Sequence, residues 1–434
     1  MPSETSTSPR VSRWASQPQH HHQCSCPFGA IEMTTAALPA DLNGITRDQI
    51  TPEQRRCIDA IRAGVKDALN ASPPRVQSGE FGAGLRGVRH GLHVPTVDVR
   101  IRQPQRIIPR IRRVVACIKA LGYHKLPEMT IEQINTFLTG ENRMVRVFPG
   151  GVIGEDRIGN LISVTCFGAV NPKTLVRSGR VSEVYRLMVA QGEALSQAVR
   201  RNEKKYGRKL GVYMILDLEN LTWDVVYMPA LKHATFPDLG AQMYVVNGPS
   251  IVKAFFTMLE PALAQKSRDR ITFLGEDWRQ RVCEKFGEEN LYRRWGGTRP
   301  HRNDWGDINM DVVHGKVDFD KYIWNPDQHA EFIVPEEELE EAVLTAGRRT
   351  TVDARITRAG QKIRWYFTVS SGEVCFEIIE KSTCTVVWPR FRLGTEWVPE
   401  FGEVVIKKPG LYEVAWCSSG KWLSKELRYD VRIV

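Results

Sequence analysis

Four short apolar runs separated by helical stretches constrain the middle of this chain more than any other feature. The runs span 161–167, 211–218, 242–248 and 271–274. Each is too short for a buried helix and nearly free of charge, which is typical of strands that are covered on both faces. The order strand, helix, strand implies a mainly parallel sheet with helices packed against it, so we predict an α/β domain.

The helical stretches repeat their apolar residues every three or four positions. The clearest case is 181–206, where they are Val181, Val184, Tyr185, Met188, Gly192, Leu195 and Val199. This spacing predicts one long helix with an apolar side. Shorter helices are predicted over 107–121 and 131–138, and a further one starts at Thr51 to Glu53.

These helices make 46–140 a helical N-terminal region, which is irregular over the segment 72–106, rich in Gly and Arg. Residues 1–45 are rich in Ser, Thr, Pro, Gln and His and show no period. We expect them to form a disordered tail, because such a composition cannot bury enough apolar surface to fold.

The hydrophobic period drops to two after residue 349. In 363–369 and in 426–434, apolar and polar residues alternate, and turn sequences stand at 370–372 and 407–410. This pattern predicts a small antiparallel β-sandwich over 350–434. Residues 311–349 are interpreted as a linker that ends in a helix over 335–349. Pro335 suits the first turn of this helix, and glutamates lie at the positive end of its dipole.

The net charge of +10 is unevenly distributed along the 434 residues. Nine arginines and no lysine lie between Ser72 and Val115, a block that could contact anionic lipid or nucleic acid. The chain has no zinc-finger spacing and no aromatic ladder, so we expect no nucleic-acid partner. No apolar run reaches the roughly 18–20 residues that span a bilayer. The N-terminal residues lack the apolar core of a secretory signal peptide. We therefore expect a cytoplasmic protein.

Candidate catalytic and metal motifs are weak. Residues 82–87 match the dinucleotide fingerprint in letters, but no strand precedes them, so a glycine-rich loop is the simpler interpretation. Residues 20–26 hold three histidines and two cysteines without the spacing of a closed metal site. Asp217 with Glu219 is interpreted as a turn former at a strand end. We expect no enzyme activity, no metal and no cofactor.

The stretch 249–260 has helical spacing but confines its polar residues, Ser250, Lys253, Thr257 and Glu260, to one thin stripe. A helix that is apolar nearly all round is usually buried in a large core. A helix with one side on a sheet and the other on a cavity would show the same pattern. A lipid tail could fill that cavity.

Segments between 148 and 298 resemble the CRAL-TRIO lipid-binding domain of phosphatidylinositol-transfer and tocopherol- or retinal-binding proteins. In chain order they are FPGGVIGEDRIGN (148–160), ILDLENL (215–221), FPDLGAQMYVVNGP (236–249), LEPAL (259–263), RDRITFLG (268–275) and RRWGGT (293–298). The C-terminal part is similar to the GOLD domain, a β-sandwich that follows this lipid domain in one subgroup. The resemblance implies a CRAL-TRIO domain over 144–310 and a GOLD domain over 350–434.

The resemblance also implies a lipid pocket closed by a mobile gate helix, which falls on 249–260. The lipid contacts that it implies are Val252, Phe255, Phe256 and Leu259 of the gate helix, and Tyr213 and Ile215 of a strand. Members that hold phosphatidylinositol use an acid, a hydroxyl and a cation. The matching positions are Asp238, Ser267 and Arg270, which are chemically near-equivalent.

Two features depart from the family pattern. Glu260 stands where a basic residue is usual, and the connection between Pro229 and Phe236 is shorter than expected.

Our first hypothesis is a monomeric, non-enzymatic protein that binds a hydrophobic lipid and transfers or senses it at membrane surfaces. Phosphatidylinositol is the candidate lipid and the Golgi the candidate membrane. The alternative hypothesis is an adaptor in membrane trafficking. In that case the GOLD domain binds a protein partner and the lipid pocket is vestigial.

Overall fold

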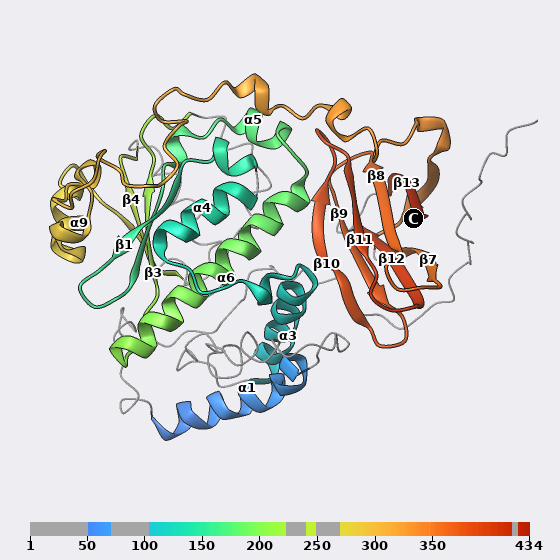
Figure 1. Cartoon of the computed structure of the whole chain (residues 1–434), viewed down its shortest axis with the longest axis horizontal. Coiled ribbons are helices and arrows are strands. Elements are labelled where there is room, and N and C mark those ends of the chain that lie inside the picture. The colour runs from blue at the N-terminus through green and yellow to red at the C-terminus, as the bar shows by residue number, and fades with distance from the viewer. Residues whose placement is uncertain are drawn as a thin grey trace, which may run out of the picture.

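The computed structural model describes residues 51–70, 104–141, 143–222, 240–248, 270–346, 348–418 and 424–434. These residues form an α/β domain and a C-terminal β-sandwich that contact one another (Figure 1). The predicted tail 1–45, most of the irregular segment 72–106 and the predicted gate helix 249–260 lie outside the described residues.

The α/β domain is built on a five-stranded sheet in the order β1-β2-β3-β4-β5. The strands are β1 (Gly150–Glu155), β2 (Leu161–Thr165), β3 (Val212–Asp217), β4 (Gly240–Val246) and β5 (Ile271–Phe273). β1 runs antiparallel to β2, and all other neighbours are parallel. The mainly parallel sheet and the four predicted strands are therefore confirmed.

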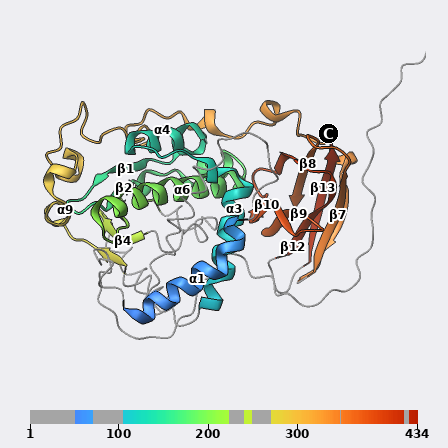
Figure 2. The ribbon, with the colours of Figure 1, turned by 60° about the horizontal axis from the view of Figure 1, so that its bottom comes forward.

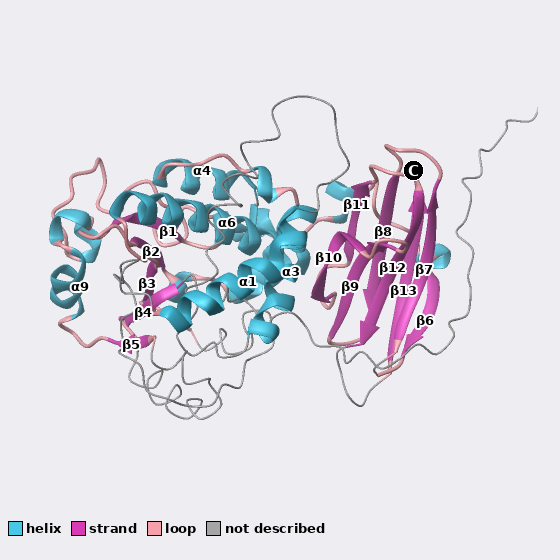
Figure 3. Cartoon of the chain, turned by 90° about the horizontal axis from the view of Figure 1, so that it is seen from below, coloured by secondary structure: helices cyan, strands magenta, loops and turns pink. Residues whose placement is uncertain are grey.

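The helices of this domain lie on both faces of the sheet (Figure 3). They are α4 (Ile131–Glu141), α5 (Pro172–Arg177), α6 (Val181–Tyr206) and α9 (Trp278–Phe286). Helix α6 has the bounds that its apolar spacing predicts, and it ends at Gly207, which adopts the left-handed conformation typical of a helix end.

The two faces of the sheet belong to different hydrophobic cores. Val152, Leu161 and Val212 pack with α4 and α6, whereas Ile162 and Tyr213 pack with α9. This division follows from the strand itself, because successive side chains point to opposite faces. We call the two sides the α6 face and the α9 face.

A helical pair stands beside the sheet. α1 (Pro52–Asn70) packs on α3 (Pro104–Ala120) through a small core of Ile61, Val65, Ile111 and Val115. The predicted helices at residue 51 and over 107–121 are thus confirmed. A short 3-10 helix, η2 (Tyr123–Lys125), follows α3. Figure 2 shows α3 next to β10 of the sandwich.

The C-terminal body consists of two antiparallel sheets in the orders β10-β9-β12-β7 and β11-β8-β13-β6. The strands are β6 (Glu340–Leu344), β7 (Arg349–Ile356), β8 (Lys362–Val369), β9 (Glu373–Glu380), β10 (Thr385–Gly394), β11 (Glu400–Val405), β12 (Gly410–Ser418) and β13 (Lys425–Ile433). Their inward side chains share one core, in which Phe367 contacts Trp416 across the sheets. The predicted antiparallel β-sandwich is confirmed.

The helix predicted over 335–349 is wrong. A 3-10 turn at Glu336–Glu338 is followed by β6, which pairs with β13. The glutamates that favour a helix dipole serve instead as partners of β13, because Arg428 pairs with Glu336 and Glu341. Pairing with β13 therefore overrides the local helix signal, and the sandwich begins before the predicted boundary at 350.

The N-terminus of α6 joins the two bodies. Tyr185 stacks on Phe391 of β10 with ring centroids 4.9 Å apart, and it belongs to the core of the sandwich. The Arg180 guanidinium lies 4.3 Å above the Phe401 ring and donates a hydrogen bond to the Phe401 carbonyl oxygen. The sandwich is thus packed directly against the central helix of the α/β domain.

A carboxyl group is buried in this junction. Glu400 is 1% exposed, and its carboxyl group hydrogen-bonds to Ser182 of α6. Its Oε1 has no hydrogen-bond partner among the described residues. Burial raises the pKa of Glu400 to about 7, although Arg180 and Ser182 act in the opposite direction.

We predict that Glu400 makes stability depend on pH. The folded protein keeps this proton up to about pH 7, whereas an unfolded glutamate loses it near 4.5. Stability should therefore fall as pH rises from about 4.5 to about 7, by up to about 3 kcal/mol. Glu400→Gln cannot ionise and should lose this dependence, which urea unfolding at pH 5 and pH 8 measures. Glu396→Gln, an exposed control, should retain it, and parallel curves for wild type and Glu400→Gln would contradict the prediction.

Candidate functional site

On the α6 face, the described helices cover one part of the sheet better than the other. Val152, Leu161 and Val212, on β1 to β3, are at most 4% exposed. Farther across, the same face carries one buried apolar residue, Val245, and five that are only half-buried. The five are Met214, Leu216, Met243, Ile271 and Phe273. We call this group the apolar shelf.

Strand register shows that these residues share one face. Met214 lies two positions after Val212, which packs under α6. Met243 of β4 is the register partner of Met214, and Ile271 of β5 is the partner of Met243. Register partners in a parallel sheet point the same way, so Met214, Met243 and Ile271 form one row across three strands. In the next row, Val245 lies between Leu216 and Phe273 and is 4% exposed.

Tyr213 and Ile215, which we expected to contact lipid, lie on the α9 face. They are 2% and 0% exposed, and the Tyr213 ring is 5.2 Å from the Phe286 ring of α9. A ligand on the apolar shelf would therefore contact Met214 and Leu216, their neighbours in the strand. The sequence period shows that β3 has two faces, but both are apolar and the period does not distinguish them.

Arg270 is the one described member of the predicted headgroup set. It is half-buried and stands directly before β5, where its carbonyl oxygen accepts a hydrogen bond from Met243 N–H at 2.7 Å. Arg270 is thus at the edge of the apolar shelf, next to Ile271. The other predicted contacts lie outside the described residues. They are Asp238, Val252, Phe255, Phe256, Leu259 and Ser267.

A polar network closes the carboxyl ends of β3 and β4. Buried Asp217 accepts hydrogen bonds from Asn247 Nδ2 at 2.9 Å and from Glu219 N–H at 3.0 Å. Asn247 Oδ1 accepts a further bond from Trp278 Nε1 at 2.8 Å. The interpretation of Asp217 as a turn former is therefore confirmed. Both the nitrogen and the oxygen of the Asn247 side-chain amide are therefore hydrogen-bonded. Asn247 directly follows β4 and has a positive φ of 54°. This residue was not identified from the sequence.

The described residues near this edge offer no activated nucleophile. Burial raises the pKa of the Cys166 thiol to about 12, so the thiol stays protonated. Across the described ranges, no group of three His, Cys, Asp or Glu side chains is placed to hold a metal ion. The helices found there also include none that is both long and apolar enough to cross a bilayer.

Comparison with known proteins shows what this region is similar to. Residues 146–297 match the model of the CRAL/TRIO domain. Two Caenorhabditis elegans proteins are similar to the chain. CRAL-TRIO domain-containing protein F28H7.8 is 26% identical over 165 residues, which cover 35% of this chain and 40% of that protein. CRAL-TRIO domain-containing protein T23G5.2 is 23% identical over 156 residues, which cover 32% of this chain and 22% of that protein. The chain thus spans less than half the length of either relative.

Two solved structures show weaker likeness. The crystal structure of Sfh5 aligns with 65% of this chain and 98% of its own, at 13% identity and a TM-score of 0.38. A structure described as CBM4 aligns with 22% of this chain and 82% of its own, at 13% identity and a TM-score of 0.19. Both scores are too low to support an argument. The identity of the sandwich as a GOLD domain stays a prediction.

The mainly parallel sheet and the family model concern the same part of the chain. Residues 146–297 therefore match the CRAL/TRIO domain.

Proposed function

We propose that the chain binds one hydrophobic lipid on the apolar shelf and transfers or senses it at membrane surfaces. The observation that carries this proposal is the change in burial along the α6 face. Val212 is buried under α6, whereas Met214 and Leu216, farther along the same strand, are only half-buried. An acyl chain on this surface would gain about 25 cal/mol for each Å² of apolar area removed from water.

The topology supports the α6 face as the ligand side. Helix α6 connects β2 to β3 and lies on this face, and the strand order continues in the same direction through β4 and β5. Right-handed connections in a parallel sheet then cross the same face each time. The proposed gate helix, 249–260, belongs to the connection between β4 and β5. In this proposal, one of its apolar sides faces the lipid above the apolar shelf.

Membrane contact would make lipid exchange feasible. A gate helix that swings open at a bilayer would transfer its apolar surface from the pocket to the interface rather than to water, which lowers the cost of opening. We therefore propose a cytoplasmic monomer that associates peripherally with membranes, with the Golgi as the candidate. Proteins with this domain generally carry lipids and are not enzymes, which supports a non-enzymatic role.

Phosphatidylinositol is the proposed ligand. Asp238, Ser267 and Arg270 match the acid, hydroxyl and cation of family members that hold this lipid. Arg270 stands at the edge of the apolar shelf, from which a guanidinium could form paired hydrogen bonds with a phosphate. The acyl chains would then extend over the apolar side chains of β4 and β5.

Met243→Asp should abolish lipid loading. The new carboxylate would face the acyl chain at a cost of several kcal/mol, so we expect at least about 30-fold weaker binding of a fluorescent phospholipid. Gln242→Asp is the matched control, because it places the same group one position away on the opposite face of β4. Equal losses in the two variants, with equal thermal stability, would contradict the assignment of the α6 face.

Arg270→Gln should change which lipid is bound. Loss of a charge-assisted hydrogen bond to the phosphate should reduce phosphatidylinositol in the purified protein about tenfold, while bound neutral lipid, which has no phosphate, stays constant. Mass spectrometry of the extracted lipids measures both. Arg281→Gln, which removes an exposed cation from α9, should leave the lipid profile unchanged. Recovery of only neutral isoprenoids or sterols from the wild type would rule out phosphatidylinositol as the ligand.

Phe255→Asp should separate a carrier from an adaptor. A carboxylate on the lipid side of the proposed gate should stop transfer of labelled phosphatidylinositol between donor and acceptor vesicles. Lys253→Asp changes a residue of the polar stripe of the same stretch and should leave transfer largely intact. If the wild type itself transfers no lipid and holds none, the result would favour the adaptor hypothesis.

A further inference from the structure

The outward face of the sheet β11-β8-β13-β6 ends in a row of three neighbouring residues. Val405 of β11 pairs with Lys362 of β8, and Val434 exchanges both backbone hydrogen bonds with Lys362. Residues paired across an antiparallel ladder point to the same face. Val405 and Val434 are 52% and 50% exposed, so this row presents two apolar side chains to solvent around one cation.

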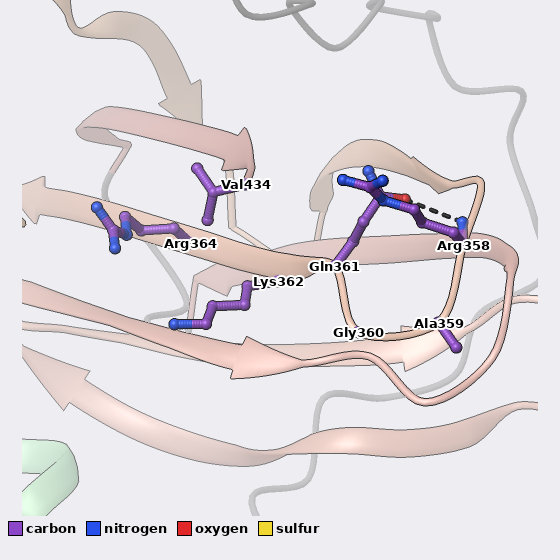
Figure 4. A pocket seen from close by; sticks show the side chains of 7 residues that line it. All are labelled: Arg358, Ala359, Gly360, Gln361, Lys362, Arg364 and Val434. Carbon is purple, nitrogen blue, oxygen red and sulfur yellow. Dashed lines mark hydrogen bonds between the residues drawn. The ribbon is translucent and has the colours of Figure 1, made fainter.

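A cavity of about 600 Å³ opens beside this row. Arg358, Lys362 and Arg364 line it together with Val434, and none of the described side chains that line it is acidic. Figure 4 shows these side chains around the beginning of β8. Glu403 is an acidic partner here, and it pairs with both Lys362 and Arg364. One carboxylate thus faces the three cations Arg358, Lys362 and Arg364, so the charged side chains at the cavity keep a positive excess.

The loop after β11 adds two exposed cations, Lys407 and Lys408. This loop is anchored to its neighbours. Ile406 N–H donates to the Gln361 carbonyl oxygen at 2.8 Å, and the Tyr412 hydroxyl donates to the Lys408 carbonyl oxygen at 2.8 Å. Lys407 and Lys408 are thus presented on an ordered turn beside the cavity.

Positive charge continues across the junction with the α/β domain. His124 of η2 lies near Lys119, Lys125 and Lys407, and its pKa is lowered by burial and by the charges of these three lysines. No acidic residue contributes to this shift. Lys119 and Lys125 of the helical region and Lys407 of the sandwich therefore lie close enough to His124 to lower its pKa.

We propose that this end of the sandwich docks onto an anionic bilayer. We call it the basic tip, and its members are Arg358, Lys362, Val405, Lys407, Lys408 and Val434. The proposal deepens the lipid-exchange function and rests on it for its biological role, because exchange requires contact with a membrane. The evidence for docking comes only from the exposed cations and valines of the basic tip.

The composition of the basic tip fits a bilayer better than other anions. Each Lys or Arg near an anionic leaflet contributes to binding through the negative surface potential. Exposed valines among those cations can enter the headgroup region, where apolar surface is removed from water. A free phosphate or a nucleic-acid backbone would use the cations but leave Val405 in water.

Vesicle co-sedimentation of the full chain tests the proposal. The wild type should bind phosphatidylcholine vesicles that contain phosphatidylserine, bind pure phosphatidylcholine vesicles poorly, and dissociate as salt rises. Lys407→Glu with Lys408→Glu should weaken binding by at least about tenfold. Lys204→Glu with Lys205→Glu is the matched control, because it changes two adjacent exposed lysines at the other end of α6 by the same charge.

A second pair of variants tests the apolar part. Val405→Asp should weaken vesicle binding several-fold, whereas Val343→Asp, at a 63% exposed position on the opposite edge strand β6 of the same sheet, should not. Both positions are exposed, so both variants should fold, and thermal unfolding checks this.

Three results would overturn the proposal. They are equal binding to vesicles with and without phosphatidylserine, equal loss in the tip and control variants, and release of the bound protein by millimolar inorganic phosphate or by short duplex RNA. The last result would indicate a general polyanion site.

Mass spectrometry of the lipid that co-purifies with the protein distinguishes failure of this docking proposal from failure of the proposed lipid binding. Tip variants should retain their lipid, and a wild type that sediments with vesicles but carries no lipid would contradict the proposed function alone.

Discussion

Helix α6 contacts both the α/β domain and the sandwich, and its packing fixes the relative position of the parts. Its N-terminus stacks Tyr185 on the sandwich, its middle covers the sheet through residues such as Val189 and Ala194, and it also packs against α4. Burial on several sides requires its polar residues to be paired, and Glu193 indeed bonds Arg200 at 3.0 Å. The sheet, the helices and the sandwich therefore share one structural support.

Local patterns predicted the elements well where packing and period agree. The spacing in 181–206 gave the bounds of α6, and the alternation through Trp365 and Phe367 gave β8, because in both cases burial follows the same period as the backbone. The strand β6 was missed for the opposite reason. Its sequence favours a helix locally, and only pairing with Tyr429 and Arg428, far away in the chain, makes it a strand.

The candidate site could be located in the chain but not oriented. Motif order placed it around β3 to β5, yet neither period nor composition distinguishes Tyr213 from Met214, because both faces of β3 are apolar. The difference arises from where α6 and α9 lie, which is a property of the assembled domain. For the same reason, the row formed by Val405 and Lys362 is visible only once the ladder register is known.

The junction at Tyr185, Arg180 and Glu400 leaves the sandwich little freedom to turn relative to the sheet, since stacked rings and a buried carboxyl resist shear. The orientation of the sandwich therefore fixes the orientation of the α/β domain. If a flat surface meets one end of the sandwich, the tilt of β3 to β5 above that surface is set as well. The distance between that surface and the point where a bound ligand would leave the sheet is then set by the geometry of the junction.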